Sequence, residues 1–345
     1  MNSETDARQR KAATAISVVL VGGAQAGVER LQAALPTAMI RSVEAGAPQL
    51  PDALSSADAI VADVLTARDL SRARGVKLIQ VPGAGYDGIE LDAVPPGCTV
   101  CNVFEHEIAI GEWVLMEMLA LTRRLLSYDR GLREGLWTTA HRFEGEAEHD
   151  LRGRTIGLIG LGHIGSEVAR LGRAIGMEAV GVTRNPNHMR EAAAGLGWLR
   201  PIAALDELLH ESDFAVVALP LTQGTRSLIG HEELRLLGPD GYLINVSRGP
   251  IVDEEALFEA LRTRAIAGAA IDVWYRYPAA ARERTLPSRF PFWALENVVM
   301  TPHVAGFARS TVERRWSFIV SQLKHLQAGL PLENAVAVGS REIGS

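Results

Sequence analysis

The sequence predicts an α/β protein built on two doubly wound parallel sheets. Three observations support this prediction. Strand-like runs alternate with helix-like runs from end to end, which is typical of βαβ units. The 345 residues exceed the length of one average domain. A glycine-rich turn lies between a strand-like and a helix-like run near the middle of the chain.

The first series of strand-like runs is short and rich in β-branched residues. It comprises residues 16–21, 59–64 and 77–81, with a helix-like stretch at 28–35 between the first two. A second series begins at residues 155–160 (TIGLIG) and continues through residues 179–182, 214–219, 242–246, 267–273 and 297–300. We expect each series to form one sheet.

Two longer helix-like stretches lie outside these series. Residues 109–130 carry apolar side chains at helical spacing and are too polar to span a membrane, so we expect one inter-domain or subunit-packing helix. Residues 308–327 are amphipathic and long enough to return to the first domain. Residues 277–291 are rich in Pro and Arg and are expected to form a loop.

The composition argues against several classes of protein. Apolar residues make up 47% and charged residues 22% of the chain, a balance typical of folded globular proteins. The net charge is −6 and basic residues do not cluster, so we expect no nucleic-acid partner. No apolar run approaches the roughly 18 residues of a membrane span. The first residues include Glu and Asp, so we expect no signal peptide.

The two cysteines, Cys98 and Cys101, lie in one expected strand, C-T-V-C. A single C-x-x-C motif supplies too few ligands for a four-ligand zinc site. We therefore expect no metal site and interpret both cysteines as small apolar residues in a reducing compartment.

The turn GLGHIG at residues 160–165 predicts a dinucleotide-binding site, because it follows a buried strand-like run and opens a helix-like run. Gly160 would make the tight turn, Gly162 would remove a side chain that collides with a pyrophosphate, and Gly165 would let helix and strand touch. The helix N-terminus, at His163 and Ile164, would offer its N–H groups to the phosphates. The alternative is a purely structural strand–helix turn.

The next strand-like run ends at Thr183 and Arg184. Sites for NAD place an Asp or Glu at this point, where it binds the ribose hydroxyls and repels a 2′-phosphate. Here a hydroxyl stands beside a guanidinium, and a planar guanidinium suits a phosphate monoester. We expect NADP(H) to be favoured, with NAD(H) as the alternative cofactor and a solvated surface charge as the alternative interpretation of Arg184.

Three further strand-like runs end in polar residues: Asn245 to Gly249 (NVSRG), Ala269 to Trp274 (AAIDVW) and Thr301 to Gly306 (TPHVAG). The carboxyl ends of parallel strands line one edge of a sheet. Arg248 and His303 would therefore face the dinucleotide as a carboxylate clamp and a proton donor. Singly, Arg248 is also consistent with a surface charge and His303 with a helix cap.

Together these motifs resemble the D-isomer-specific 2-hydroxyacid dehydrogenase family. The resemblance rests on VPGAGYDGIE at 81–90, GLGHIG at 160–165, ALPLTQGTRSLI at 218–229, NVSRGPIVDEEAL at 245–257, AAIDVW at 269–274 and TPHVAG at 301–306. It implies two Rossmann-like or flavodoxin-like domains with the active site in an interdomain cleft. The dinucleotide-binding domain would comprise residues 107–303, and the substrate (catalytic) domain residues 1–106 and 304–345. It also implies a cytoplasmic homodimer.

The resemblance also implies roles for single residues. Arg248 matches the arginine that holds the substrate carboxylate, and His303 matches the general acid/base. The substrate-binding loop would contain Gly83, Ala84 and Gly85. Further cofactor-binding positions are Leu219, Pro220, Thr225, Val246, Ser247, Asp272, His303 and Gly306. The implied reaction is hydride transfer between the nicotinamide and C2 of a small 2-keto or 2-hydroxy acid, with reduction as the expected direction.

The sequence departs from the family at Tyr277, which we take as a third catalytic position. Most members have a Glu there, in the pattern D-V-x-x-x-E-P, which keeps the catalytic His charged. Tyr277 supplies no charge at neutral pH, so we expect His303 to titrate near its unperturbed pKa of about 6.5. Formate dehydrogenases have a neutral Gln there, but the Asn-containing segment before their long helix is missing here. Formate oxidation is therefore the less favoured alternative.

Two segments near the expected site have open interpretations. Glu105, His106 and Glu107 would offer substitute acid/base groups or form only a solvated loop at a helix start. Residues 279–290 would cover the substrate site or form a surface insertion; their arginines are Arg282, Arg284 and Arg289. A catalytically weak nucleotide sensor or partner-binding protein on the same fold is the alternative to an enzyme, although retention of both candidate catalytic residues argues against it.

Overall fold

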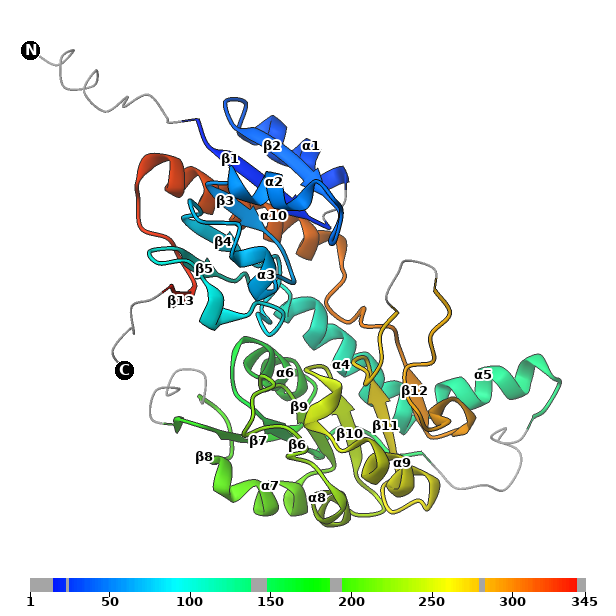
Figure 1. The fold of residues 1–345 in the computed structure, drawn as a ribbon. Coiled ribbons are helices and arrows are strands. Elements are labelled where there is room, and N and C mark those ends of the chain that lie inside the picture. The colour runs from blue at the N-terminus through cyan, green and yellow to red at the C-terminus, as the bar shows by residue number, and fades with distance from the viewer. Residues whose placement is uncertain (1–14, 23–24, 138–147, 187–193, 279–282, 340–345) are drawn as a thin grey trace, which may run out of the picture. The chain divides into compact units, whose positions relative to one another are not determined.

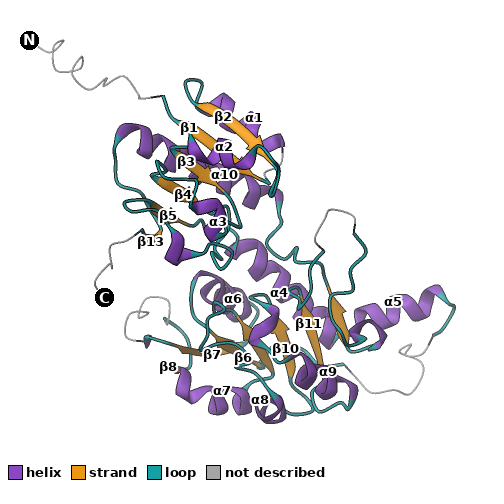
Figure 2. Ribbon diagram, viewed as in Figure 1, coloured by secondary structure: helices purple, strands orange, loops and turns teal. Residues whose placement is uncertain are grey.

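The computed structural model describes residues 15–22, 25–137, 148–186, 194–278 and 283–339. The chain divides into two compact units, Met1–Glu105 with Arg309–Ser345, and His106–Ala308. Each unit is built around one sheet with helices on both faces (Figures 1 and 2), which confirms the predicted fold class. The assignment of substrate binding to the first unit stays a prediction.

A six-stranded sheet forms the centre of the first unit, in the order β13-β5-β4-β3-β1-β2. Its strands are β1 (Ser17–Val21), β2 (Met39–Val43), β3 (Ala59–Val61), β4 (Leu78–Gln80), β5 (Thr99–Cys101) and β13 (Ala335–Val338). The first five strands are parallel, whereas β13 pairs antiparallel with β5. β2 and β13 were not among the predicted strands.

The two faces of this sheet carry different helices. One face is covered by α1 (Gln25–Ala34) and α10 (Arg309–Ala328), and the other by α2 (Leu50–Ser55) and α3 (Ala67–Leu70). Alternation along β1 separates them, because Leu20 packs with α1 and α10 while Val19 packs with α2 and α3. A Cβ at Gly27 would lie 2.4 Å from the Trp316 ring, so this glycine lets α1 and α10 approach closely. The predicted C-terminal helix therefore belongs to the first unit.

A seven-stranded parallel sheet forms the centre of the second unit, in the order β12-β11-β10-β9-β6-β7-β8. Its strands are β6 (Thr155–Ile159), β7 (Glu178–Thr183), β8 (Leu199–Pro201), β9 (Phe214–Val217), β10 (Tyr242–Asn245), β11 (Gly268–Ile271) and β12 (Val298–Met300). From β6, the chain first adds β7 and β8 on one side and then β9 to β12 on the other side. The topological switch point therefore lies between β6 and β9, and ligands of such sheets bind at the carboxyl ends of the strands there.

Helices cover both faces of this second sheet (Figure 2). They are α4 (Glu107–Thr122), α6 (His163–Ala174), α7 (Leu205–Glu211), α8 (His231–Leu237) and α9 (Glu254–Arg262), whereas α5 (Leu125–Arg133) buries none of its residues and joins neither core cluster. α4 and α6 pack on one face, and α7, α8 and α9 pack on the other. The strands between them are buried on both sides, which explains their nearly continuous apolar sequences.

The prediction of a single helix over residues 109–130 is wrong. α4 ends at Thr122 and α5 begins at Leu125, because Arg124 has φ +47° and ψ +34°, a left-handed conformation that no continuous α-helix contains. No Gly or Pro marks this break, and apolar residues continue beyond it at helical spacing. The hydrophobic pattern alone therefore concealed the break.

Cys98 and Cys101 are buried free thiols, and burial raises the pKa of both to about 12. They are consistent with the apolar role expected for them. Within the described residues, no helix has the length and apolarity needed to cross a membrane. The same part of the chain contains no cluster of three or more His, Cys, Asp or Glu residues suited to a metal ion.

Candidate functional site

The glycine-rich turn joins β6 to α6 at the switch point of the second sheet. Gly160 has φ +106°, and a Cβ there would lie 2.9 Å from the backbone of Ala218. A Cβ at Gly165 would lie 2.3 Å from the carbonyl oxygen of Gly160, so Gly165 lets α6 pack onto the turn. A Cβ at Gly162 would meet no atom within 4 Å. The open side of the turn is thus at Gly162, where a pyrophosphate needs space.

The N-terminus of α6 opens onto the same side. Gly162 is the N-cap residue, and no side-chain hydrogen bond caps the helix there. His163 is exposed and Ile164 is half-buried. The first N–H groups of this 12-residue helix and the positive end of its dipole suit a phosphate group. The residues present therefore fit a dinucleotide.

The end of β7 lies beside this turn, because the N–H of Gly160 donates to the carbonyl oxygen of Val182 at 2.9 Å. Thr183 ends the strand with a half-buried side chain, and Arg184 follows it as an exposed side chain. The structure thus places the predicted ribose-binding pair next to the predicted phosphate-binding turn. Residues 187–193 lie outside the described residues.

The ends of β9 and β10 bring together five of the predicted cofactor-binding residues. The Ser247 hydroxyl donates to the carbonyl oxygen of Leu219. The Thr225 hydroxyl donates to the carbonyl oxygen of Pro220 at 2.8 Å, which shapes the turn after β9. Val246 is buried between these segments and the core. These contacts hold both strand ends at one edge of the sheet.

Arg248 follows β10 in an extended conformation, with φ −142° and ψ 139°. The buried Asn245 fixes this turn with two hydrogen bonds. Its Nδ2 donates to the carbonyl oxygen of Arg248 at 3.1 Å, and its Oδ1 accepts the Ser247 N–H at 3.1 Å. A Cβ at Gly249 would lie 2.5 Å from the carbonyl oxygen of Trp274. Gly249 therefore lets the turn that carries Arg248 pack directly against the segment that leaves β11.

Asp272 organises the loop that carries His303. This aspartate is 2% exposed, and its Oδ1 accepts the Thr301 hydroxyl at 2.5 Å and the Val304 N–H at 2.8 Å. Its Oδ2 accepts the Ala305 N–H at 2.8 Å. These donors flank His303, whose φ of +58° is left-handed and costs a non-glycine residue about 1–2 kcal/mol. Asp272 thus fixes the loop around an unfavourable backbone conformation, whereas its predicted cofactor contact stays a prediction.

Tyr277 lies against His303, with 3.1 Å between Oη and Nδ1. The two rings are tilted by 54°, with centroids 5.8 Å apart. The Trp274 N–H donates to the same Tyr277 oxygen at 3.1 Å. The hydroxyl can donate to an unprotonated Nδ1 or accept from a protonated one, so it orients the imidazole in either state. It adds no charge to it.

The chain passes from the first unit to the second between Glu105 and His106, and each of these residues contacts its own unit. Glu105 has φ +71°, and its Oε2 lies 3.1 Å from Nε of Arg314. His106 is buried beside Gly306, where a Cβ would lie 3.4 Å from the Cβ of His106. Glu107 is half-buried at the start of α4. Glu105 is thus engaged in an ion pair within its own unit.

The predicted substrate-binding loop follows β4 in the first unit. The carbonyl oxygen of Gly83 accepts the Val103 N–H at 3.1 Å. The carbonyl oxygen of Ala84 accepts Nδ2 of the buried Asn102 at 2.8 Å. Gly85 is exposed. Because both carbonyl groups point back into the unit, the shape of the loop is fixed from one side.

Glu117, which was not predicted as a site residue, lies on the buried side of α4 and is 3% exposed. Burial, together with the negative charge of Asp272, raises the pKa of this carboxyl to about 7. Its Oε2 has no hydrogen-bond partner among the described residues. The one signal in the sequence is an acid between Met116 and Met118 in an otherwise apolar helical face.

The parallel sheet with an open glycine turn at its switch point defines a dinucleotide-binding domain. Residues 115–305, more than half of the chain, match the profile of the D-isomer specific 2-hydroxyacid dehydrogenase, NAD binding domain. The chain belongs to this family, which confirms the resemblance seen in the sequence. It is therefore an oxidoreductase with an NAD-binding domain.

Known relatives extend this similarity over most of the chain. A glyoxylate reductase of Korarchaeum cryptofilum is 32% identical over 282 residues, which cover 81% of this chain and 80% of the relative. Among solved structures, a D-isomer specific 2-hydroxyacid dehydrogenase of Xanthobacter autotrophicus Py2 with NADPH and MES is 29% identical, with a TM-score of 0.76 over 94% of this chain and 98% of that one. The D-lactate dehydrogenase of Aquifex aeolicus with NAD and lactic acid is 26% identical, with a TM-score of 0.76 over 90% of this chain and 96% of that one.

Two glycine substitutions separate cofactor binding from folding. Gly165→Ala should lower the unfolding free energy by about 1–3 kcal/mol, because the new methyl group overpacks against a backbone carbonyl. Gly162→Ala should leave thermal unfolding nearly unchanged and weaken NADPH and NADH binding by about tenfold, since its methyl group enters the open side of the turn. Thermal melts and fluorescence titration measure both effects. A Gly162→Ala protein with parental affinities would remove this turn from the cofactor site.

Glu117 predicts a specific pH dependence of stability. Its pKa rises from 4.5 to about 7 on folding, so the stability that its neutral form supports is fully present below 4.5 and is lost as the pH rises to about 7. Glu117→Gln abolishes this titration. Between about pH 5 and pH 8, the variant should therefore gain about 2 kcal/mol over the parent in urea unfolding. Parallel stability curves for the two proteins would contradict the assignment.

Proposed function

We propose that this protein interconverts small 2-keto acids and D-2-hydroxy acids with a nicotinamide cofactor and acts as a reductase. One observation carries the proposal: the carboxyl edge of the second sheet holds the glycine turn, the Arg248 turn and the Tyr277–His303 pair. When bound, the nicotinamide supplies the hydride equivalent for C2 of the substrate in reduction. The residues described below perform binding, orientation and proton transfer.

Two side chains act on the substrate in this proposal. The Arg248 guanidinium pairs with the substrate carboxylate through two parallel hydrogen bonds and polarises the adjacent keto group. His303 gives a proton from Nε2 to the carbonyl oxygen in reduction and takes it back in oxidation. Tyr277 holds Nδ1 and so keeps Nε2 directed outward. In the first unit, the Gly83–Gly85 loop supplies backbone N–H groups to a substrate carboxylate.

The cofactor is held by residues of the carboxyl edge and of the α6 N-terminus. They are Gly160, Gly162, His163, Ile164, Gly165, Thr183, Arg184, Leu219, Pro220, Thr225, Val246, Ser247, Asp272, His303 and Gly306. Among them we assign the preference for NADP(H) to Thr183 and Arg184, because a guanidinium stands where a carboxylate would select NAD. The solved relatives bound NADPH in one case and NAD in the other, so both cofactors occur among proteins of this fold.

We also propose that the protein is a homodimer whose contact surface is the outer side of α4 and α5. Met116, Leu119 and Leu125 line an apolar hollow of about 500 Å³ there. The neighbouring apolar side chains Leu126, Leu132, Leu136 and Trp137 are each about half exposed or more. Such a continuous apolar surface favours association. Sedimentation should give twice the 37.2-kDa chain mass, and Leu119→Glu should give single chains that still unfold cooperatively, at a melting temperature that no longer depends on protein concentration.

The substrate clamp is tested with Arg248→Lys. Lysine keeps the positive charge but loses the planar pair of donors, so kcat/KM for 2-keto acids should fall about 100-fold while thermal stability stays near that of the parent. A panel of glyoxylate, pyruvate and bulkier 2-keto acids with NADPH and NADH provides the assay. Parental kinetics in Arg248→Lys would exclude Arg248 from the mechanism. Cofactor binding without turnover of any keto acid would support the nucleotide-sensor alternative.

The cofactor preference is tested with Arg184→Ala. Removal of the guanidinium should weaken NADPH by about tenfold or more, the effect of one lost charge-assisted hydrogen bond, and should leave NADH nearly unchanged. Kd values from fluorescence titration of both cofactors measure the difference. If the parent already prefers NADH, or if the variant keeps the preference of the parent, the assignment to Arg184 is wrong.

A further inference from the structure

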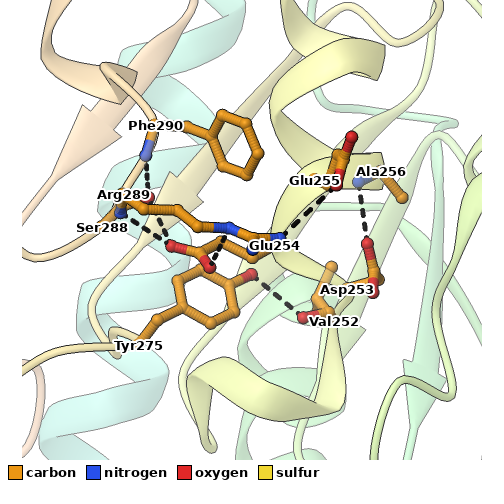
Figure 3. A network of polar contacts seen from close by, with 9 residues as sticks. All are labelled: Val252, Asp253, Glu254, Glu255, Ala256, Tyr275, Ser288, Arg289 and Phe290. Atoms are coloured by element: carbon orange, nitrogen blue, oxygen red, sulfur yellow. Dashed lines mark hydrogen bonds and ion pairs between the residues drawn. The ribbon is translucent and has the colours of Figure 1, made fainter.

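A cluster that we call the Glu254 clasp joins the start of α9 to the segment before the η5 turn (Phe292–Ala294) (Figure 3). It consists of Glu254, Ser288 and Arg289. Oε1 of Glu254 accepts the Ser288 hydroxyl at 2.7 Å and the Arg289 N–H at 2.9 Å, and Oε2 lies 3.1 Å from Nε of Arg289. The Glu254 side chain is 16% exposed and Ser288 is 2% exposed. One shielded carboxylate thus receives three donors from two consecutive residues.

The clasp closes the base of the loop that begins with Tyr277. The carbonyl oxygen of Pro287 accepts the N–H groups of Tyr275 at 3.3 Å and of Arg276 at 3.0 Å. The loop therefore starts after Tyr275 and Arg276 and ends beside them at Pro287, one residue before Ser288. Of the loop between, residues 279–282 lie outside the described residues, and Arg284 is exposed. Tyr277, which contacts His303, follows directly after this closed base.

The clasp also reaches the turn that carries Arg248. The 3-10 turn η4 (Gly249–Ile251) leads from Arg248 to α9, and the N–H of Val252 donates to the carbonyl oxygen of Gly249 at 3.0 Å. The hydroxyl of the half-buried Tyr275 donates to the carbonyl oxygen of Val252 at 3.0 Å, as Figure 3 shows. Glu254 follows two residues later. The same few residues therefore link the Arg248 turn to the base of the Tyr277 loop.

Aromatic packing supports the clasp from the core side. Phe290 stacks on Phe258 of α9 with 5.2 Å between ring centroids. Phe292 meets Phe258 edge-on at 5.4 Å and Trp274 at 6.0 Å. Trp274 in turn donates its indole N–H to the carbonyl oxygen of Thr301 at 2.8 Å, next to the His303 loop. Displacement of the clasp is thus transmitted through packed rings rather than absorbed by solvent.

We propose that Glu254 is a positioning residue that sets the Tyr277–His303 pair relative to Arg248. The proposal rests on the proposed function, in which Arg248 and His303 act on one substrate. Proton transfer and carboxylate binding need both groups within a fraction of an ångström of their productive positions. Glu254 contacts neither of them, and acts through Ser288, Arg289 and the closed loop base. The competing explanation is a general one, in which any acid in the first turn of α9 stabilises the helix dipole.

Glu255 provides a matched control for this alternative. It is the next residue of α9 and lies 3.5 Å from Nη2 of the same Arg289, but its side chain is 60% exposed. Glu255→Gln removes the same charge from the same helix turn, but leaves in place all three donors that Glu254 receives from Ser288 and Arg289. Ser288→Ala removes one donor to Glu254 from the other end of the clasp and leaves the helix charge in place.

The experiment compares Glu254→Gln, Ser288→Ala and Glu255→Gln with the parent enzyme. The first two should lower kcat by about tenfold, change the KM for NADPH by less than about twofold, and shift the pH profile of reduction in the same direction. The kcat of the double variant should be no lower than that of the less active single variant, because both substitutions break the same clasp. In both single variants, the NMR titration curve of the His303 ring should shift toward the curve recorded for Tyr277→Phe. Glu255→Gln should match the parent in every measurement.

Two results would overturn the inference. Equal losses in Glu254→Gln and Glu255→Gln would assign the effect to the helix dipole. A lower melting temperature with an unchanged pH profile and unchanged His303 titration would show a purely structural role. If the parent reduces no 2-keto acid, the proposed function fails, whereas the His303 titration still decides whether the clasp positions the ring.

Discussion

The candidate catalytic edge depends on one buried carboxylate. Asp272 accepts hydrogen bonds from both sides of His303 and thereby closes a loop whose central residue has a left-handed backbone. That backbone conformation costs about 1–2 kcal/mol, and each hydrogen bond to a charged group contributes about 1.5–3 kcal/mol. The three bonds together outweigh the strain. The position of His303 is thus a property of β11 and its aspartate as much as of the loop itself.

Two contacts that orient the candidate residues are hydrogen bonds of neutral side chains rather than ion pairs. Asn245 fixes the backbone of Arg248, and Tyr277 meets His303 through a neutral hydroxyl. Exposed pairs such as Arg262–Glu259 contribute little to stability and weaken in salt. The geometry of the carboxyl edge should therefore be insensitive to ionic strength, whereas the binding of charged ligands to it should not be.

Much of this architecture follows from local sequence. Alternating strand-like and helix-like runs predicted both sheets, and the roles of the glycines at 160–165 agree with the space around each of them. The features that escaped prediction depend on tertiary contacts. Nothing near Glu117 in the sequence reveals that it lies close to Asp272, and β13 becomes a strand only because β5 offers a distant edge. The helix break at Arg124 also lacks any Gly or Pro signal.

The discontinuous first unit imposes an order on the folding of a newly made chain. Its sheet ends in β13 and one of its faces is covered by α10, and both are synthesised after the whole of His106–Ala308. On the ribosome, the second unit can therefore complete its core while the Val18 and Leu20 side of β1 has only α1, and not yet α10, to cover it. The sheet of β1 to β5 is thus begun before the second unit and completed after it, and during that interval its uncovered apolar side chains are open to chaperones.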